Sequence, residues 1–478
     1  MHYKDIQNVE AWVLSKVLTT QAQKLGSRIA ITFIDGEKWS YANCLTEARN
    51  TAVVLNRLGI RTQDKVVVMV AINTGLKGSI LEHQIVNATP ALIVADSDFS
   101  AVVTQAVEGS SCRAPIKLIQ KTSPNQASGT ETPTRVSYQP FNPPTKSSDL
   151  SCIMYTSGTS GPSKGVMMPE AHCFMFALGT IENQQLRSDD TFYISLPLFH
   201  ANGLFMQLYP SLIMGAKAVI RSRFSASNWL RDIQIHNATH TNLLGATAAF
   251  VVAQPETSKD RDHQLRVIGA APLPEKSEHI LRSRFGVGDV LPLYGMTEVN
   301  IPLYGKIGES APGTCGKVYG RWFEVEIRDP NTDLPVQDGT VGEIMVRPKQ
   351  PYCFMSGYAQ MPDNTIEAWR NFWFHTGDAA RKREDGYFVF VDRIKDSIRR
   401  RGENISSYEV EQALIQIDGI TEVAAYGVPA TIKNTNNRDL TRSATDGMED
   451  EVMVAIQITP EHDLAPQTIH ALSLGSVP

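Results

Sequence analysis

The stretch YTSGTSGPSKGV, from Tyr155 to Val166, follows the apolar pair Ile153 and Met154 and contains three glycines and a single lysine, Lys164. Glycines expose backbone N–H groups, hydroxyls add further donors and a lysine supplies a positive charge, a combination suited to phosphate oxygens. The P-loop pattern G-x-x-x-x-G-K-[ST] does not fit, because a glycine follows the lysine. The stretch therefore predicts a phosphate-binding loop outside the P-loop NTPases, and a flexible surface loop is the alternative when the stretch is considered alone.

Length and composition exclude several classes of protein. The chain has 478 residues, of which 42% are hydrophobic, and this is enough for two or more buried cores. A net charge of −5 offers no general attraction for nucleic acid or for anionic membranes. The six cysteines show no metal-ligand spacing, residues 1–17 lack the apolar core of a signal peptide, and no apolar run approaches the ~20 residues that span a bilayer. We expect a reduced, cytoplasmic protein with no nucleic-acid partner and no transmembrane segment.

Periodicity predicts an α/β domain near the start of the chain. Residues 44–60 carry apolar side chains at helical spacing, and residues 64–70 form an apolar run typical of a buried strand. Residues 121–149 are rich in Pro, Ser and Thr, so we expect a long surface connection there. The predicted helical face consists of Leu45, Ala48, Ala52 and Leu55.

The second half of the chain is richer in strand patterns. Residues 323–329, 341–348 and 386–392 predict the strands of a smaller β-rich subdomain. Further on, Ser406 and Glu409 form a capping-box pattern before a helix, and residues 451–459 alternate as a strand. The apolar stripe of that helix consists of Val410, Ala413, Leu414 and Ile417. This part of the chain indicates a small α+β domain.

Two more motifs follow the glycine-rich loop. They are LPLYGMTE, residues 291–298, and WFHTGDAARKREDGYFVFVDRIKDSIRRRGENIS, residues 373–406. With the loop, they resemble the acyl-adenylate-forming (AMP-binding) superfamily, in the family's motif order over nearly the whole chain. The segments MMPEAHC, LPLFHANG and FVDRIKDSIRRRGENIS are most similar to the crotonobetaine/carnitine-CoA ligase branch.

The resemblance implies an α/β fold with two domains. A large multi-subdomain adenylate-forming domain, with mixed sheets, helices and the small β-rich subdomain, would span residues 1–392. A small mobile α+β domain would span residues 393–478, with a hinge near Lys395. A few hinge torsions suffice for such domain motion.

The resemblance also implies an AMP-forming acid–CoA ligase that uses ATP, Mg²⁺ and coenzyme A. A carboxylate would attack the ATP α-phosphorus to give an acyl-adenylate, and the thiol of coenzyme A would then take the acyl group. The segments VNIPLY and LPLFHANG are mostly apolar with no obvious cationic selector, so we expect a carnitine-like or fatty acid rather than an amino acid.

Each matched position carries an implied role. Glu298 would coordinate Mg²⁺, Thr297 would contact the α-phosphate, and Lys164 and Thr159 would act on the other phosphates. Tyr294 would stack on adenine, Asp378 and Arg393 would bind ribose, and Gly402 would lie beside the pantetheine tunnel. For His200, a position lining the acyl pocket and an ordinary packed histidine both stay open. The other implied binding residues are Thr156, Ser157, Gly158, Ser160, Gly161, Gly269, Ala270, Ala271, Gly295 and Met296.

Two departures from the family pattern affect the predicted activity. Between Val70 and Ala71 there is no room for an α/β unit that the family carries. The sequence also contains no P-K-T-x-x-G-K motif near its end, whose lysine bridges the carboxylate and the α-phosphate in the family. We therefore expect an incomplete small domain. An adenylation-impaired protein that binds nucleotide or acyl-adenylate is the alternative function.

Overall fold

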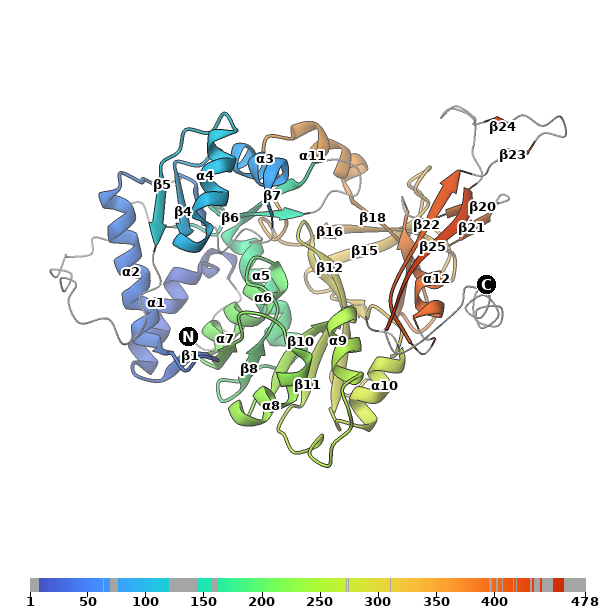
Figure 1. The fold of residues 1–478 in the computed structure, drawn as a ribbon, viewed down its shortest axis with the longest axis horizontal. Coiled ribbons are helices and arrows are strands. Elements are labelled where there is room, and N and C mark those ends of the chain that lie inside the picture. The colour runs from blue at the N-terminus through green and yellow to red at the C-terminus, as the bar shows by residue number, and fades with distance from the viewer. Residues whose placement is uncertain are drawn as a thin grey trace. The chain divides into compact units, whose positions relative to one another are not determined.

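The computed structural model (Figure 1) describes most of the chain up to residue 394 and parts of the remainder. The described residues are 8–62, 64–68, 76–119, 145–156, 162–271, 273, 275–309, 311–394, 398–400, 403–405, 407–415, 417, 419–429, 432–433, 439–440 and 450–459. Several predictions lie outside them. These are the loop residues 157–161, most of the connection at 121–149, the junction at Val70, the hinge Lys395, Gly402, Ser406 and the tail after 459.

The chain divides into two compact units. The first consists of Met1–Glu324 and Arg347–Phe372, and the second of Val325–Val346 and Trp373–Pro478. The second unit thus contains most of the β-rich segments as well as the residues predicted for the small domain. The predicted boundary near residue 393 is a hinge between two domains and not a limit of these compact units. It stays a prediction.

The first unit is built around a nine-stranded sheet of order β14-β13-β12-β11-β10-β8-β9-β1-β2. Its central pairs are parallel, whereas β1–β2 and β12–β13–β14 are antiparallel. The strands are β1 Ile29–Phe33, β2 Lys38–Ser40, β8 Thr191–Ile194, β9 Lys217–Ile220, β10 His240–Leu244, β11 Val267–Ala271, β12 Asp289–Met296, β13 Asn300–Tyr304 and β14 Lys317–Val318.

Helices pack around this sheet and bury an apolar core. Figure 1 shows α8, α9 and α10 grouped around β10 and β11, and the core includes Trp229, Ile268, Leu281 and Val290. None of the helices in the described stretches combines the length and the apolar character needed to cross a bilayer. The helices are α1 Leu14–Leu25, α2 Tyr41–Arg57, α5 Glu170–Asn183, α6 Ala201–Gly203, a π-helical turn Leu204–Leu208, α7 Tyr209–Met214, α8 Ala226–His236, α9 Gly245–Val252 and α10 Glu275–Ser283.

The predicted helix at 44–60 is confirmed as α2, which begins after the N-cap residue Ser40. Of the four residues of the predicted apolar face, Ala48 is exposed and the other three are half-buried. The buried residues of α2 are instead Tyr41 and Cys44, in its first turn. The predicted strand at 64–70 is confirmed over β3, Val66–Val68, in a parallel sheet β3-β4-β5. This sheet is completed by α3 Gly78–Ala88, β4 Leu92–Asp96, α4 Ser100–Glu108 and β5 Ile116–Ile119.

A three-stranded antiparallel sheet, β17-β7-β6, frames the glycine-rich loop. Strand β6, Leu150–Thr156, enters the loop and strand β7, Lys164–Pro169, leaves it, with Thr156 paired to Lys164. Strand β17, Gly357–Tyr358, pairs with β7 and is followed by helix α11, Pro362–Ala368. The loop therefore starts and ends on two neighbouring strands.

The second unit holds most of a four-stranded sheet of order β15-β16-β18-β19. Strands β15, β16 and β19 correspond to the three strands predicted for the β-rich region, which are therefore confirmed. Its smaller part contains α12, whose stripe residues Val410 and Leu414 are buried against strands β22 and β25. The helix and the alternating strand predicted there are confirmed as well. The elements are β15 Phe323–Arg328, β16 Gly342–Pro348, β18 Phe374–Lys382, β19 Phe388–Arg393, β20 Ile398–Arg400, β21 Glu403–Ile405, α12 Ser407–Leu414, β22 Ile420–Pro429, β23 Ile432–Lys433, β24 Asp439–Leu440 and β25 Asp450–Ile458.

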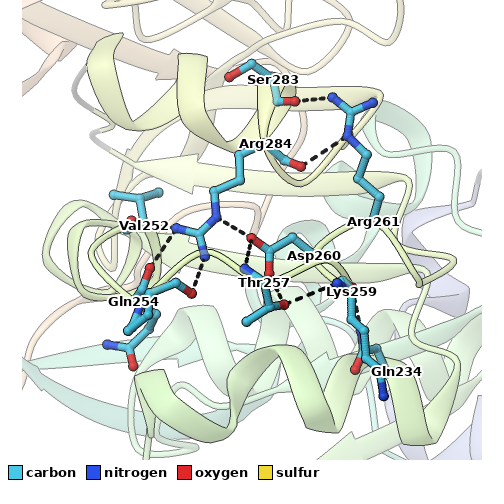
Figure 2. Close-up of polar contacts among 10 residues, drawn as sticks. Gln234, Val252, Gln254, Thr257, Lys259, Asp260, Arg261, Ser283 and Arg284 are labelled. Atoms are coloured by element: carbon cyan, nitrogen blue, oxygen red, sulfur yellow. Dashed lines mark hydrogen bonds and ion pairs between the residues drawn. The ribbon is translucent and has the colours of Figure 1, made fainter.

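An arginine from the end of α10 fastens the loop that follows α9 (Figure 2). The Nε of Arg284 lies 2.5 Å from a carboxylate oxygen of Asp260, and its terminal nitrogens donate to the carbonyl oxygens of Val252, Gln254 and Pro255. Asp260 in turn accepts hydrogen bonds from Thr257. The side chains of Arg284 and Asp260 are nearly buried. Their hydrogen bonds link the loop to the residue that directly follows α10.

Candidate active site

Thr156 and Lys164 stand at the two ends of the glycine-rich loop. The hydroxyl of Thr156 lies 3.5 Å from the carbonyl oxygen of Lys164, which matches their pairing across β6 and β7. The Lys164 ammonium lies 4.9 Å from the centre of the Tyr358 ring. A cation over an aromatic face is held there electrostatically. The loop's only lysine is therefore positioned by β17.

Glu298, at the turn between β12 and β13, reaches the same place. Its Oε1 accepts a hydrogen bond from the Tyr358 hydroxyl at 3.1 Å and lies 3.5 Å from the Thr156 hydroxyl. Glu298 is only 4% exposed and Tyr358 6%. Burial, and next the Glu298 carboxylate, keep the pKa of Tyr358 above its usual range, so the hydroxyl remains a donor. The structure thus brings Thr156, Lys164 and Glu298 together, and sequence analysis missed Tyr358.

Thr297 is held in place by a buried histidine from α5. The Nε2 of His172 lies 2.8 Å from the Thr297 carbonyl oxygen, and its Nδ1 lies 2.7 Å from that of Cys353. Burial lowers the pKa of His172 to about 4 although both carbonyl contacts oppose this, so the ring is neutral at pH 7. His172 lies within MMPEAHC, which pointed to a family branch but indicated no role for this side chain.

The end of β12 is tightly packed. A Cβ on Gly295 would lie 2.1 Å from the carbonyl oxygen of Asn300, so only glycine fits the present backbone. Asn300 adopts a positive φ of 71°, and its amide donates to the His172 carbonyl oxygen. Tyr294, predicted to stack on adenine, is 8% exposed, and Met296 is half-buried. Their predicted contacts with nucleotide stay predictions.

Gly269 lies inside β11 against a chain of amide side chains. A Cβ there would lie 2.5 Å from both Asn242 Oδ1 and Gln184 Nε2. Gln184 donates to Asn242, and Asn242 and Gln207 both donate to Asn202 Oδ1. This packing alone requires glycine at 269. Ala270 belongs to the core and Ala271 is half-buried, so the predicted adenine wall stays a prediction.

His200 precedes the short helix α6 and is exposed, with its ring 4.5 Å from that of Phe199. It is therefore not a packed core histidine, which was one of the two interpretations. The other, a position lining the acyl pocket, stays a prediction.

Asp378 and Arg393 face each other across β18 and β19 in the second unit. The Arg393 Nε lies 3.4 Å from a carboxylate oxygen of Asp378. Asp378 is buried, whereas the Arg393 side chain is 46% exposed. Next to them, Asp392 accepts hydrogen bonds from the backbone N–H and the hydroxyl of Ser407, the first residue of α12. This contact ties α12 to β19.

Among Thr156, Lys164 and Glu298, the oxygen atoms of Thr156 and Glu298 could coordinate Mg²⁺, but only together with oxygen atoms of a bound phosphate. Mg²⁺ prefers oxygen ligands and is often held by one or two carboxylates plus substrate phosphates. Glu298 offers such a carboxylate beside two hydroxyl groups. Within the described stretches, no group of three or more His, Cys, Asp or Glu side chains could hold a metal ion by itself. A magnesium ion here would therefore share its coordination with phosphate oxygens.

Comparisons with known proteins identify the family of the chain. The AMP-binding enzyme family matches residues 67–359. Sulfoacetate–CoA ligase from Cupriavidus necator is 33% identical over 291 residues, which are 60% of this chain and 56% of that protein. Crotonobetaine/carnitine–CoA ligase from Salmonella paratyphi A is 28% identical over 455 residues, 86% of each chain. The chain thus spans little more than half of the first relative and most of the second.

A solved structure has the same fold. ATP-bound MatB from Rhodopseudomonas palustris matches with a TM-score of 0.79 at 22% identity, covering 97% of this chain and 92% of that chain. The similarity confirms the predicted α/β fold. The roles of the individual site residues stay predictions.

Proposed function

The chain belongs to the AMP-binding enzyme family, and we propose that it is an AMP-forming acid–CoA ligase. It joins a carboxylic acid to ATP to give an acyl-adenylate and pyrophosphate, and then transfers the acyl group to coenzyme A. The observation that carries the proposal is the convergence of Thr156, Lys164 and Glu298, because the first two bound the glycine-rich loop and the third follows β12.

This cluster can offset the repulsion between the two anions that meet in the first half-reaction. A carboxylate must approach a phosphorus that carries negative oxygens, so the site needs fixed positive charge and donors aimed at phosphate. Lys164 supplies the charge, and Thr156 with loop residues 157–161 supplies donors. Mg²⁺, held by Glu298 and the phosphates, would neutralise further charge on ATP. Thr297 would contact the α-phosphate, with Tyr294 and residues 269–271 near the adenine.

The second unit would bind the ribose and take part in thioester formation. An ionised carboxylate only accepts hydrogen bonds, so Asp378 suits two ribose hydroxyls, with Arg393 beside it. Residues 393–478 would move about Lys395 between the two half-reactions, bringing Gly402 beside coenzyme A. We expect the protein to be cytoplasmic.

For the acid, we propose a carnitine-like or fatty acid. The name of one relative, crotonobetaine/carnitine–CoA ligase, supports a carnitine-like acid, whereas sulfoacetate, which the other relative's name gives, carries a second acidic group. The apolar segments LPLFHANG and VNIPLY favour the same class, and His200 would line the acyl pocket.

The test is acid-dependent exchange of pyrophosphate into ATP, followed by thioester formation with coenzyme A, over carnitine-like, fatty and amino acids. We expect exchange with one of the first two classes. Nucleotide binding without exchange would favour the alternative, a nucleotide- or adenylate-binding protein. Exchange with amino acids alone would overturn the substrate class.

Nucleotide affinities test the residue roles. Asp378→Ala should weaken ATP and AMP alike, because both contain ribose, whereas Lys164→Ala combined with Thr159→Ala should weaken ATP much more than AMP. Asp385→Ala and Lys276→Ala, at exposed positions, are the matched controls. Equal losses of ATP and AMP from the loop variant would contradict the phosphate assignment.

A further inference from the structure

Tyr358 contacts both charged residues of the cluster at once. Its hydroxyl donates to Glu298 Oε1 at 3.1 Å, and the face of its ring lies under the Lys164 ammonium at 4.9 Å. Lys164 and Glu298 also share Thr156 as a neighbour. One side chain therefore contacts a carboxylate and an ammonium, two groups of opposite charge.

The backbone that carries Tyr358 is fixed on both sides. Ser356 N and Ala359 N donate to the carbonyl oxygens of Met167 and Gly165 at 2.8 and 2.7 Å, and Tyr358 N donates to the Thr365 hydroxyl at 2.9 Å. Gly357 has a φ of 137°, a conformation that side chains disfavour. The backbone from which the ring extends is thus held in place, and the Tyr358 side chain is nearly buried.

We propose that Tyr358 is a positioning residue that orients the Glu298 carboxylate for Mg²⁺-bound phosphate and holds the Lys164 ammonium over the face of its ring. The proposal rests on the proposed function, since it assigns the orientation of two residues of that same site. The hydroxyl fixes the carboxylate and the ring face fixes the ammonium. Without the hydroxyl, the carboxylate loses one of its hydrogen bonds and is held less firmly for a Mg²⁺-bound phosphate, whereas the ring still holds the ammonium.

Two substitutions separate the two contacts. Tyr358→Phe keeps the ring under Lys164 and removes only the hydrogen bond to Glu298. Tyr358→Leu removes both contacts. Tyr352→Phe is the matched control, because Tyr352 lies in the same segment and is 51% exposed.

The readout is the affinity of each protein for ATP with magnesium, ATP with a chelator and AMP, measured by calorimetry. Loss of a residue that orients a metal ligand typically lowers metal affinity about 10- to 100-fold. We therefore expect Tyr358→Phe to lower the magnesium-dependent gain in ATP affinity about 10-fold, with metal-free ATP and AMP within about twofold of the parent. Tyr358→Leu should also weaken metal-free ATP, and Tyr352→Phe should change nothing.

A purely structural role would weaken all three ligands equally in Tyr358→Phe, and that result would overturn the proposal. A parent protein that binds ATP and AMP without any effect of magnesium would overturn it too, while leaving nucleotide binding intact. A parent protein that binds no nucleotide would refute the proposed function and this proposal together. Titration of the Mn²⁺–ATP complex, followed by the paramagnetic resonance of Mn²⁺, gives a second comparison of parent and Tyr358→Phe, and equal affinity for this complex in both would count against the orienting hydroxyl.

Discussion

The imidazole of His172 lies 2.8 Å from the carbonyl oxygen of Thr297, the residue that precedes Glu298. Its other nitrogen lies 2.7 Å from the carbonyl oxygen of Cys353. A single buried side chain of α5 therefore fixes the turn that carries the acidic residue of the site and the segment that leads to β17.

Replacing His172 by alanine should destabilise the protein and loosen this turn. The neutral ring donates from one nitrogen only, so one buried carbonyl oxygen would lose a hydrogen bond, which costs about 1–3 kcal/mol. We expect a lower denaturation midpoint together with weaker ATP binding. His279→Ala, at an exposed position of α10, should leave both unchanged. An unaltered midpoint for His172→Ala would contradict the bridging role.

Acid should destabilise the protein below pH 6.5. The pKa of His172 is about 4 in the folded protein, against an ordinary value of 6.5, so the unfolded chain takes up its proton first as the pH falls. The resulting loss of stability between pH 6.5 and 4 is about 3 kcal/mol for this residue. The pKa of His240 is lowered by burial as well and acts in the same direction.

The check is the thermal midpoint of the parent and of His172→Gln at pH 7 and pH 5. The variant should lose less stability than the parent over this interval, because one titrating group has been removed. An equal loss of stability in the parent and in His172→Gln would contradict a lowered pKa for His172.

Gly295→Ala should disrupt the turn between β12 and β13. The added Cβ would lie 2.1 Å from the Asn300 carbonyl oxygen, so the backbone that carries Glu298 must move. Overpacking of this kind costs about 1–3 kcal/mol, and we expect ATP affinity to fall about 10-fold. Gly320→Ala is the control, since its nearest neighbour is 3.9 Å away. Normal ATP binding by Gly295→Ala would show that the turn tolerates the shift.

Arg284→Met should be among the most destabilising changes away from the site. It leaves the buried Asp260 carboxylate unpaired, and breaking a buried pair in this way costs about 3–5 kcal/mol. Arg370→Met removes an ion pair with Glu367 whose side chains are 40% and 73% exposed, and should change stability by less than about 1 kcal/mol. Combining Arg284→Met with Asp260→Asn should cost less than the sum of the two changes. Additive losses would show that the two residues act independently.

Local patterns predicted the elements but not the contacts between distant segments. The strands β15, β16 and β19 and the helix α12 follow from periodicity within a few residues. The Tyr358–Glu298 hydrogen bond joins positions 60 residues apart, and the His172–Thr297 contact joins positions 125 apart. No repeat or capping pattern records such pairs. The same holds for Asp392, which binds the first residue of α12 from a preceding strand.

Gly269 illustrates a different limit. The sequence predicts that Gly269 forms part of the wall against which adenine lies. In the structure, the amide groups of Gln184 and Asn242 lie where a Cβ of residue 269 would be. A motif match shows that a small residue is required there, and the reason for the requirement depends on neighbours from other strands.

The chain of amides that runs from Gln184 through Asn242 to Asn202, joined there by Gln207, has a fixed polarity, since each donated hydrogen needs an oxygen turned toward it. A substitution at one of these positions leaves the neighbouring amide with a donor or an acceptor that has no matching partner. During divergence, these four positions and Gly269 should therefore be inherited as a set. Homologues that lose one amide should show compensating changes at its neighbour, and this linked variation would mark the cluster in an alignment even where overall similarity is low.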